Sequence, residues 1–302
     1  MPKGVTDFLR TPDWKRQRGW RTAIWKGLSR VGLTGLHFLP VHSDWVEVTR
    51  LPMPIAGLDP AFVGVRLVLI SDLHFSPFVS MPYLVQTLEM VNGLAPDLII
   101  VSGDLITGGR AFSMGIASLL ASLRASIGTI ATLGNHDYTM FGRDRSMRGK
   151  TVADRLEHDI ENAGVTVLRN EQLHLTHNNS VKPLVIVGLD DVWSGHLDAG
   201  RAFTGLSEKE SIVCINHDPA NAKELLGFPW QWMLSGHTHG RAIDENAAVK
   251  RLSLARVREF VRGHYALAPG KDLYVNRGLA YGKSRDRHCL PEITVFTLCG
   301  AV

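Results

Sequence analysis

Apolar and polar residues follow one another along this chain in a pattern that predicts strands alternating with helices from Trp45 onward. The run Val65–Ile70 is continuously apolar and ends at Ser71-Asp72, as expected of a strand buried on both faces. Further strands are expected at Val46–Arg50, Asp97–Val101, Gly128–Leu133, Val165–Leu168, Leu184–Leu189, Ser211–Ile215, Trp232–Leu234, Leu273–Val275 and Ile293–Leu298, with helices at Tyr83–Leu94, Phe112–Leu123 and Val152–Ala163. Pro52, Pro54, Gly57 and Pro60 predict a loop after the first strand.

This order of elements predicts an α/β chain in which helices cover the faces of the sheets. With 45% hydrophobic and 21% charged residues, the 302-residue chain can bury a large core, which excludes a fully disordered protein. Its three cysteines are too few for a disulfide scaffold. There is no internal repeat and no Gly-, Ser- or Pro-rich linker after residue 60. The simplest division is an N-terminal arm, residues 1–44, and one domain, residues 45–302.

The positive charge of the chain is concentrated in the arm. Residues 1–30 hold eight of the 33 Lys and Arg residues and two of the 29 Asp and Glu residues. The other 272 residues therefore carry 25 basic and 27 acidic side chains, a net charge of −2. Trp20, Ile24, Leu28 and Val31 share one face of a predicted helix. A basic amphipathic helix of this kind fits either an anionic membrane surface, contacted by residues 14–39, or the surface of the main domain.

No stretch of the sequence has the roughly 18 apolar residues without charge that a membrane-spanning helix needs. The nearest stretch, Val31–Val41, contains Thr34 and His37 and is too short. No small-residue cleavage pattern follows it. We therefore expect neither a spanning helix nor a cleavable signal peptide.

Polar residues gather at the carboxyl ends of five predicted strands. The segments are Ser71-Asp72-Leu73-His74, Ser102-Gly103-Asp104, Gly134-Asn135-His136-Asp137, Asn216-His217-Asp218 and Ser235-Gly236-His237-Thr238-His239-Gly240. In open α/β sheets the ligand site lies at this edge, so we expect the five segments to meet there.

Seven side chains of these segments carry oxygen or nitrogen atoms that bind metal ions: Asp72, His74, Asp104, Asn135, His217, His237 and His239. Seven ligands are more than one ion would use, but they suit two ions that share a carboxylate. Because no thiolate is among them, we expect manganese, iron or zinc. Each motif alone is also typical of a turn or a helix cap. The presence of all five at strand ends favours a metal site.

These motifs, in this order, resemble those of the calcineurin-like metallophosphoesterase superfamily over about residues 45–300. Within it the chain is similar to a bacterial membrane-associated branch, through Trp45-Val46-Glu47-Val48-Thr49, Val275-Asn276-Arg277-Gly278 and Leu290-Pro291-Glu292-Ile293-Thr294. Some members of that branch are UDP-2,3-diacylglucosamine pyrophosphatases of lipid A biosynthesis. The resemblance implies a four-layer α/β/β/α sandwich with two mixed sheets, and a cytoplasmic protein peripheral to the inner membrane.

The resemblance also implies a role for each site residue. Asp72, His74 and His239 would hold one divalent ion, Asn135, His217 and His237 would hold the other, and Asp104 would bridge the two. A hydroxide held by the ions would attack phosphorus in line. His136 would stabilise or protonate the departing oxygen as a general acid.

Three positions leave alternatives open. The residue that orients His136 is not identified, with Asp137 as one candidate. Arg277 follows a predicted strand and can either bind a substrate phosphate or form a surface ion pair. The branch usually has Gly-Gln after the glycine equivalent to Gly240, whereas this chain has Arg241-Ala242.

We therefore expect a two-metal phosphoesterase that hydrolyses a phosphate or pyrophosphate ester, either a small molecule or a lipid headgroup such as UDP-2,3-diacylglucosamine. A nuclease or cyclic-nucleotide phosphodiesterase with the same site is a second hypothesis. The net charge of −2 outside the arm disfavours nucleic acid as a partner. A non-catalytic metal-binding scaffold is a third hypothesis, but it gives no reason for His136 beside the ligands.

Overall fold

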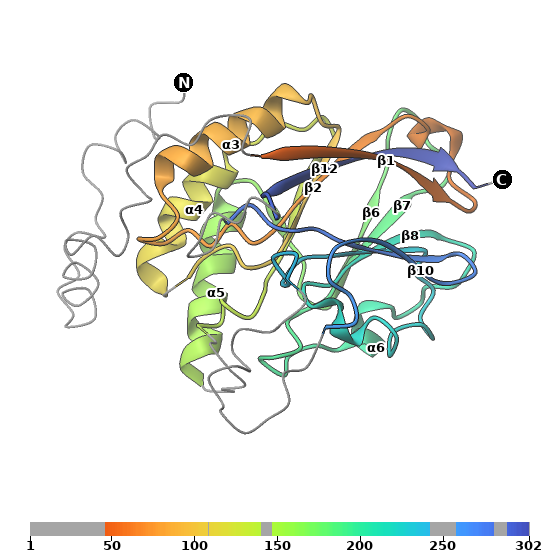
Figure 1. Cartoon of the computed structure of the whole chain (residues 1–302). Helices are drawn as coiled ribbons and strands as arrows, with labels where there is room; N and C mark the ends of the chain where they lie inside the picture. Colours follow the sequence, from red (N-terminus) through yellow and green to blue (C-terminus); the bar gives the residue numbers. More distant parts are fainter. Residues whose placement is uncertain (1–45, 108, 140–146, 242–257, 281–288, 302) are drawn as a thin grey trace.

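The computed structural model describes residues 46–107, 109–139, 147–241, 258–280 and 289–301 (Figure 1). The arm, residues 1–44, and the expected membrane contact, residues 14–39, lie outside these described residues. Among the helices of the described part, none has the length and apolar character needed to cross a membrane.

Two six-stranded sheets form the centre of the fold. The first contains, in spatial order, β1 (Glu47–Ile55), β12 (Glu292–Gly300), β2 (Arg66–Ile70), β3 (Leu98–Ser102), β4 (Gly128–Thr132) and β5 (Thr166–Val167). The second contains β10 (Gly263–Ala268), β11 (Lys271–Val275), β9 (Trp232–Ser235), β8 (Ser211–Ile215), β7 (Leu184–Gly188) and β6 (Glu171–Leu175). Each sheet has parallel and antiparallel neighbours, so both are mixed, as predicted.

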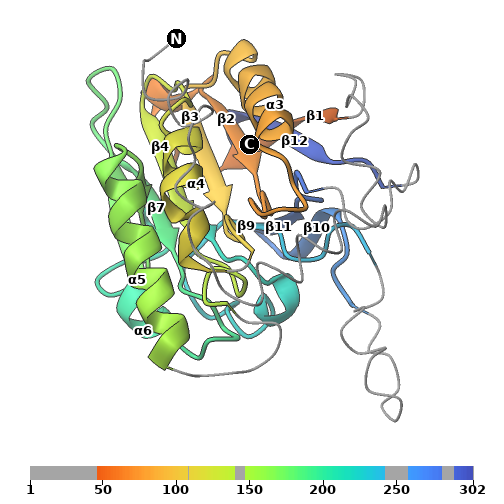
Figure 2. The same cartoon turned by 90° about the vertical axis from the view of Figure 1, so that its left-hand side faces the viewer.

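Helices flank the two sheets. On the outer face of the first sheet lie α3 (Met81–Gly93), α4 (Ser113–Leu120) and α5 (Met147–Asn162), side by side (Figures 1 and 2). The outer face of the second sheet is covered by loops and by the short helix α6 (Ala199–Ala202). Within the described residues there are also three 3-10 helices, η4 (Pro60–Phe62), η5 (Arg110–Phe112) and η6 (Pro219–Asn221). The predicted arrangement is confirmed, although the helical layer on the second sheet is thin in the described part.

Apolar side chains fill the spaces between these layers. In β3, Leu98 and Ile100 face the second sheet, whereas Ile99 and Val101 face the helices, and all four are fully buried. Because both faces of the strand are covered, its sequence is continuously apolar instead of alternating. The rigid sheets that result fix the positions of the loops at their carboxyl ends.

The structure differs from the sequence prediction at the sheet edges. β1 continues to Ile55 through Pro52 and Pro54, where the sequence predicts a loop. Because β1 is the outermost strand of its sheet, a residue without an N–H group is tolerated there. The sequence also fails to predict β6 and β10, the two outermost strands of the second sheet. Both are partly exposed, and β6 lacks a continuous apolar run.

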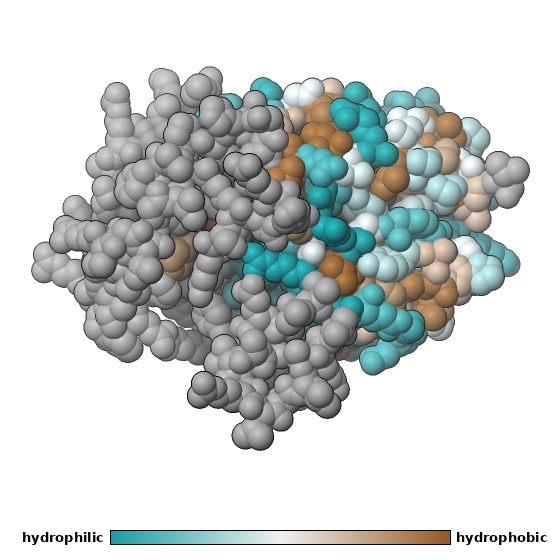
Figure 3. Space-filling view, in the orientation of Figure 1, coloured by the Kyte–Doolittle hydropathy of each residue, from teal (hydrophilic) through white to brown (hydrophobic). Residues whose placement is uncertain are grey.

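The described surface mixes hydrophilic and hydrophobic residues on the face shown in Figure 3. Among the described residues the exposed large hydrophobic side chains are Val63, Met114 and Val181. They come from three different segments of the chain, and single apolar side chains of this kind are normal on a protein surface.

Candidate metal centre

The loops after five strands carry the candidate ligands. Asp72 and His74 follow β2, Asp104 follows β3, Asn135 and His136 follow β4, His217 follows β8, and His237 and His239 follow β9. These strands belong to both sheets, so the loops of the two sheets meet at one end of the sandwich.

The backbone at five of these residues has an uncommon conformation. Positive φ angles between 46° and 69° occur at Asp72, His74, Asp104, His237 and His239. For a residue other than glycine this left-handed region costs about 1–3 kcal/mol, and such strain is concentrated at functional sites. Hydrogen bonds between loops hold the conformation: the Asp72 N–H donates to the carbonyl of Gly103 at 3.0 Å, and the His74 N–H to that of Asp104 at 2.9 Å.

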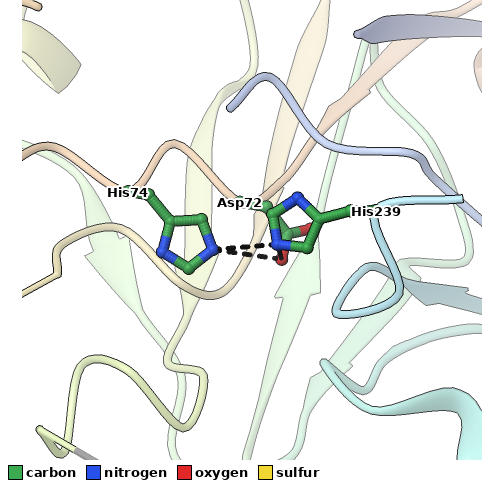
Figure 4. Close-up of side chains that lie close together, drawn as sticks. All are labelled: Asp72, His74 and His239. Carbon is green, nitrogen blue, oxygen red and sulfur yellow. Dashed lines mark hydrogen bonds and ion pairs between the residues drawn. The ribbon is translucent and has the colours of Figure 1, made fainter. Parts of the chain in front are cut away.

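Asp72, His74 and His239 form the first group of ligand atoms (Figure 4). Nε2 of His74 lies 3.1 Å from Nε2 of His239. Oδ1 of Asp72 lies 3.8 Å from the former nitrogen and 3.5 Å from the latter. Two ring nitrogens and a carboxylate oxygen from two different loops thus converge on a space that one cation can fill.

Asp104, His217 and His237 form the second group. Oδ2 of Asp104 lies 3.2 Å from Nε2 of His217 and 3.4 Å from Nε2 of His74, so this carboxylate reaches both groups. Oδ1 of Asn135 lies 3.0 Å from Nδ1 of His237 and adds an amide oxygen. The structure therefore brings all seven predicted ligand residues together.

The hydrogen bonds of His217 test whether a metal ion fits this space. Nδ1 of His217 lies 2.7 Å from the carbonyl oxygen of Ser102, a bond for which Nδ1 must carry the proton. In the neutral ring Nε2 then holds a lone pair, and this atom is buried without a hydrogen-bond partner, 3.2 Å from Oδ2 of Asp104. Two lone pairs at this distance require a proton or a cation between them. His217 therefore fits a metal ligand that is oriented through its other nitrogen.

The charges of the site also favour cations. Burial alone would raise the pKa of Asp104, but the charge of His217 holds this pKa well below its usual value. Burial opposes ionisation of Asp72 in the same way, yet His239 holds the pKa of Asp72 below its usual value. Burial lowers the pKa of His239 to about 4 against the opposing charge of Asp72. The site thus combines ionised carboxylates with a neutral His239, the form in which histidine binds metals. Burial opposes the charged form of His74 and His217, but the neighbouring carboxylates raise the pKa of both rings, so these two rings also gain from a cation close to Asp72 and Asp104.

His136 lies beside the ligands. Its backbone N–H donates to Oδ1 of Asp104 at 2.8 Å, and its ring meets that of His74 edge-on, with centroids 4.7 Å apart. Burial lowers the pKa of His136 to about 4, partly offset by the charge of Asp104. An imidazole in this position can donate a hydrogen bond to a group bound at the site.

Asp137 connects two loops of the site through hydrogen bonds. Its carboxylate accepts hydrogen bonds from the backbone N–H groups of Leu105 at 2.9 Å, Ile106 at 3.0 Å and Gly134 at 2.9 Å. The Asp137 carboxylate thus joins the loops after β3 and β4, and its role as the residue that orients His136 stays a prediction.

Several groups that contact the candidate ligands are not predicted from the sequence. Oδ2 of Asp218 accepts a hydrogen bond from Nε1 of Trp193 at 2.7 Å and lies 3.9 Å from Nε2 of His237. Oγ1 of Thr107 lies 2.6 Å from Nδ1 of His74. Asp218 belongs to one of the strand-end motifs, which is a usable signal. Thr107 and Trp193 lie in loops with no pattern that marks them.

The Arg277 side chain is bound by two carboxylates. Its Nε lies 3.0 Å from Oε2 of Glu292, and one terminal nitrogen lies 2.9 Å from Oε2 of Glu47. The ion pair is one of the two alternatives that the sequence leaves open. Contact between Arg277 and a substrate phosphate stays a prediction.

Comparison with known proteins shows that the chain is similar to phosphoesterases. The sequence profile of the calcineurin-like phosphoesterases matches residues 65–241. The UDP-2,3-diacylglucosamine pyrophosphatase LpxG of Chlamydia trachomatis is 29% identical over 294 residues, covering 84% of this chain and 89% of that protein. LpxG of Chlamydia muridarum is 30% identical over 292 residues, covering 83% and 86%. Phosphodiesterase YaeI of Escherichia coli is 25% identical over 234 residues, covering 77% and 82%.

Proposed function

Because the chain belongs to the calcineurin-like phosphoesterase family and is a hydrolase of phosphoric esters, we propose that it works with two divalent ions on a phosphate or pyrophosphate ester. The observation that supports two ions is the Asp104 carboxylate, whose Oδ2 atom lies within 3.4 Å of a histidine in each ligand group. A carboxylate between two groups of ligands is what a pair of ions requires.

The seven ligand residues divide into two sets around Asp104. Asp72, His74 and His239 would hold one ion, and Asn135, His217 and His237 would hold the other. The set contains imidazole, carboxylate and amide ligands without a thiolate, which suits manganese, iron or zinc. When bound, such ions polarise phosphoryl oxygens and lower the pKa of a water molecule.

His136 is the proposed catalytic residue. Neither of the two proposed ions needs it as a ligand. Its backbone bond to Asp104 and its edge contact with His74 fix the ring at the border of both ligand groups. From there it would donate a hydrogen bond or a proton to the departing oxygen, a contribution worth about 10²- to 10⁴-fold in rate. The variant His136→Ala should keep its metal content and lose turnover, whereas a metal-binding scaffold would show no turnover in either protein.

The first experiment measures hydrolysis of bis(p-nitrophenyl) phosphate by the full chain with added Mn²⁺. The variant Asp104→Ala should lose turnover and bound metal together. Unchanged turnover in this variant would refute the two-metal assignment.

The substrate is proposed to be a lipid-linked pyrophosphate or phosphate ester. This rests on the similarity to LpxG pyrophosphatases and on the basic amphipathic arm of the sequence. A second candidate is a phosphodiesterase acting on nucleotides, and the similarity to phosphodiesterase YaeI supports the phosphodiester part of this candidate. Purified protein should be tested against UDP-2,3-diacylglucosamine, phospholipids, cyclic nucleotides and single-stranded DNA, each with Mn, Zn and Fe. Preference for a nucleotide substrate would refute the lipid proposal.

Residues 1–44 are proposed to hold the protein at the cytoplasmic face of the inner membrane. The excess of Lys and Arg over acidic residues in this arm would attract anionic lipids. A chain that lacks residues 1–40 should not float with anionic liposomes under conditions in which the full chain does. Equal flotation of the two proteins would exclude the arm as the membrane anchor.

A further inference from the structure

Three sequence motifs that contribute no metal ligand meet at one place in the structure. Glu47 lies at the start of β1, Arg277 follows β11, and Glu292 starts β12. The Arg277 guanidinium joins both carboxylates, at 3.0 Å from Glu292 and 2.9 Å from Glu47. Tyr274 donates its hydroxyl to the other oxygen of Glu292 at 2.7 Å. The Glu292 side chain is only 3% exposed, so its charge depends on Arg277.

The turn that carries Arg277 packs directly on Asp72. Gly278 has a φ of +80°, and a Cβ atom on it would lie only 2.7 Å from Cβ of Asp72. The next two residues bind the loop of Asp72: the Leu279 N–H donates to the carbonyl of Ser71 at 2.9 Å, and the Ala280 N–H to that of Asp72 at 2.8 Å. The Glu292 N–H donates back to the carbonyl of Gly278 at 3.0 Å. The backbone around Asp72 therefore depends on this turn.

The same turn also fixes the Asp72 carboxylate. The hydroxyl of Ser71 lies 2.6 Å from Oδ2 of Asp72 and 3.0 Å from Oδ1 of Asn276. The Asn276 amide donates to Oγ1 of Thr294 at 2.9 Å, and the Gly278 N–H donates to Oδ1 of Asn276 at 2.8 Å. The Ser71 hydroxyl, whose single proton is shared between Asp72 and Asn276, thus connects one candidate ligand to the Asn276 amide and through it to β12.

We propose that Arg277 is a positioning residue for the metal centre: together with Glu47 and Glu292 it holds the turn at residues 276–278 against Asp72. The inference rests on the proposed function, because it takes Asp72 as a metal ligand. It also gives a reason for the direct bond between Glu47 and Arg277, which are 230 residues apart in sequence. A residue that only bound substrate would have no need of two carboxylates on its guanidinium.

The experiment measures Co²⁺ binding to the full chain by titration, followed through the visible absorption of the bound ion. The variant Arg277→Gln should bind one of two Co²⁺ ions about tenfold more weakly and change its spectrum, because residues that support metal ligands are worth about 10- to 100-fold in affinity. Glu47→Gln, which changes a half-exposed carboxylate that cannot bind an anionic substrate, should weaken the same ion by at least about threefold. The control Arg201→Gln breaks an exposed ion pair with Glu171 and should leave both ions unchanged.

The alternative role of Arg277 gives a different result. If Arg277 binds a substrate phosphate, Arg277→Gln raises the KM for bis(p-nitrophenyl) phosphate and leaves both Co²⁺ affinities within twofold of the wild type, which would overturn the proposal. If Arg277→Gln does not fold, Glu47→Gln decides alone, and an affinity within twofold of the wild type overturns the proposal. A wild-type chain that binds no Co²⁺ would overturn the proposed function and this inference with it.

Discussion

Replacement of Gly134 by alanine would place a methyl group between two of the ligand residues. A Cβ atom there would lie 2.3 Å from Oδ1 of Asp104 and 2.7 Å from Cδ2 of His217, whereas ordinary contacts begin at 3.4 Å. It would also lie 2.6 Å from the backbone nitrogen of Asp104, which cannot rotate away. Overpacking of this kind costs about 1–3 kcal/mol of unfolding free energy. A displacement of about 1 Å at a reacting site costs about 100-fold in rate.

The matched control for Gly134→Ala is Gly93→Ala. Gly93 is the last residue of α3, and a Cβ atom there meets no atom within 4 Å. This variant should gain about 0.5–1 kcal/mol in urea unfolding and keep full turnover of bis(p-nitrophenyl) phosphate. Gly134→Ala should lose stability, turnover and bound metal together. Wild-type turnover and metal content in Gly134→Ala would refute the close packing of Asp104 and His217 against Gly134.

Three further predictions concern residues around the site and the ions themselves. Arg169→Met should lower the free energy of unfolding by about 3–5 kcal/mol, because it leaves the buried Asp190 carboxylate, now 3.1 Å from Nε of Arg169, without its cation. Arg201→Met breaks an exposed pair and should cost about 1 kcal/mol or less in the same urea titration, so equal losses would contradict the difference in burial. Mn²⁺ should quench tryptophan fluorescence less in Trp193→Phe than in the wild type, because the Trp193 ring lies 5.5 Å from that of His237; equal quenching would place the ion elsewhere. Removal of metal by a chelator should abolish turnover and, relative to protein with metal at 100 times its Kd, lower the unfolding free energy by about 2.7 kcal/mol for each ion bound, measured by thermal unfolding. Chelated protein with unchanged stability and turnover would contradict a metal-dependent site.

The sequence predicts which side chains gather at one end of the sandwich, for a physical reason. Strands such as β3 and β8 are buried on both faces, so their apolar runs mark where each strand ends. The polar residue that follows each run, Asp104 or His217, must then lie at the carboxyl edge of its sheet. Local patterns are therefore enough to predict that candidate ligands from distant parts of the chain lie close together.

The surroundings of the ligands are harder to predict, because their contacts are long-range. No local pattern in the sequence pairs Arg277 with Glu47, which is 230 residues away. The carboxylate of Asp137 bonds backbone groups of two loops, and no local pattern in the sequence indicates these bonds. The partly exposed edge strand β6 carries too few apolar residues to be recognised.

The most direct test of the metal centre is anomalous X-ray diffraction from crystals of the full chain grown with Zn²⁺. We expect two zinc peaks, one bound by Asp72, His74 and His239 and the other by Asn135, His217 and His237, with Asp104 between them. Ligand distances should be about 2.0–2.2 Å. A single peak, or zinc bound away from Asp104, would contradict the two-metal centre on which the proposed function depends.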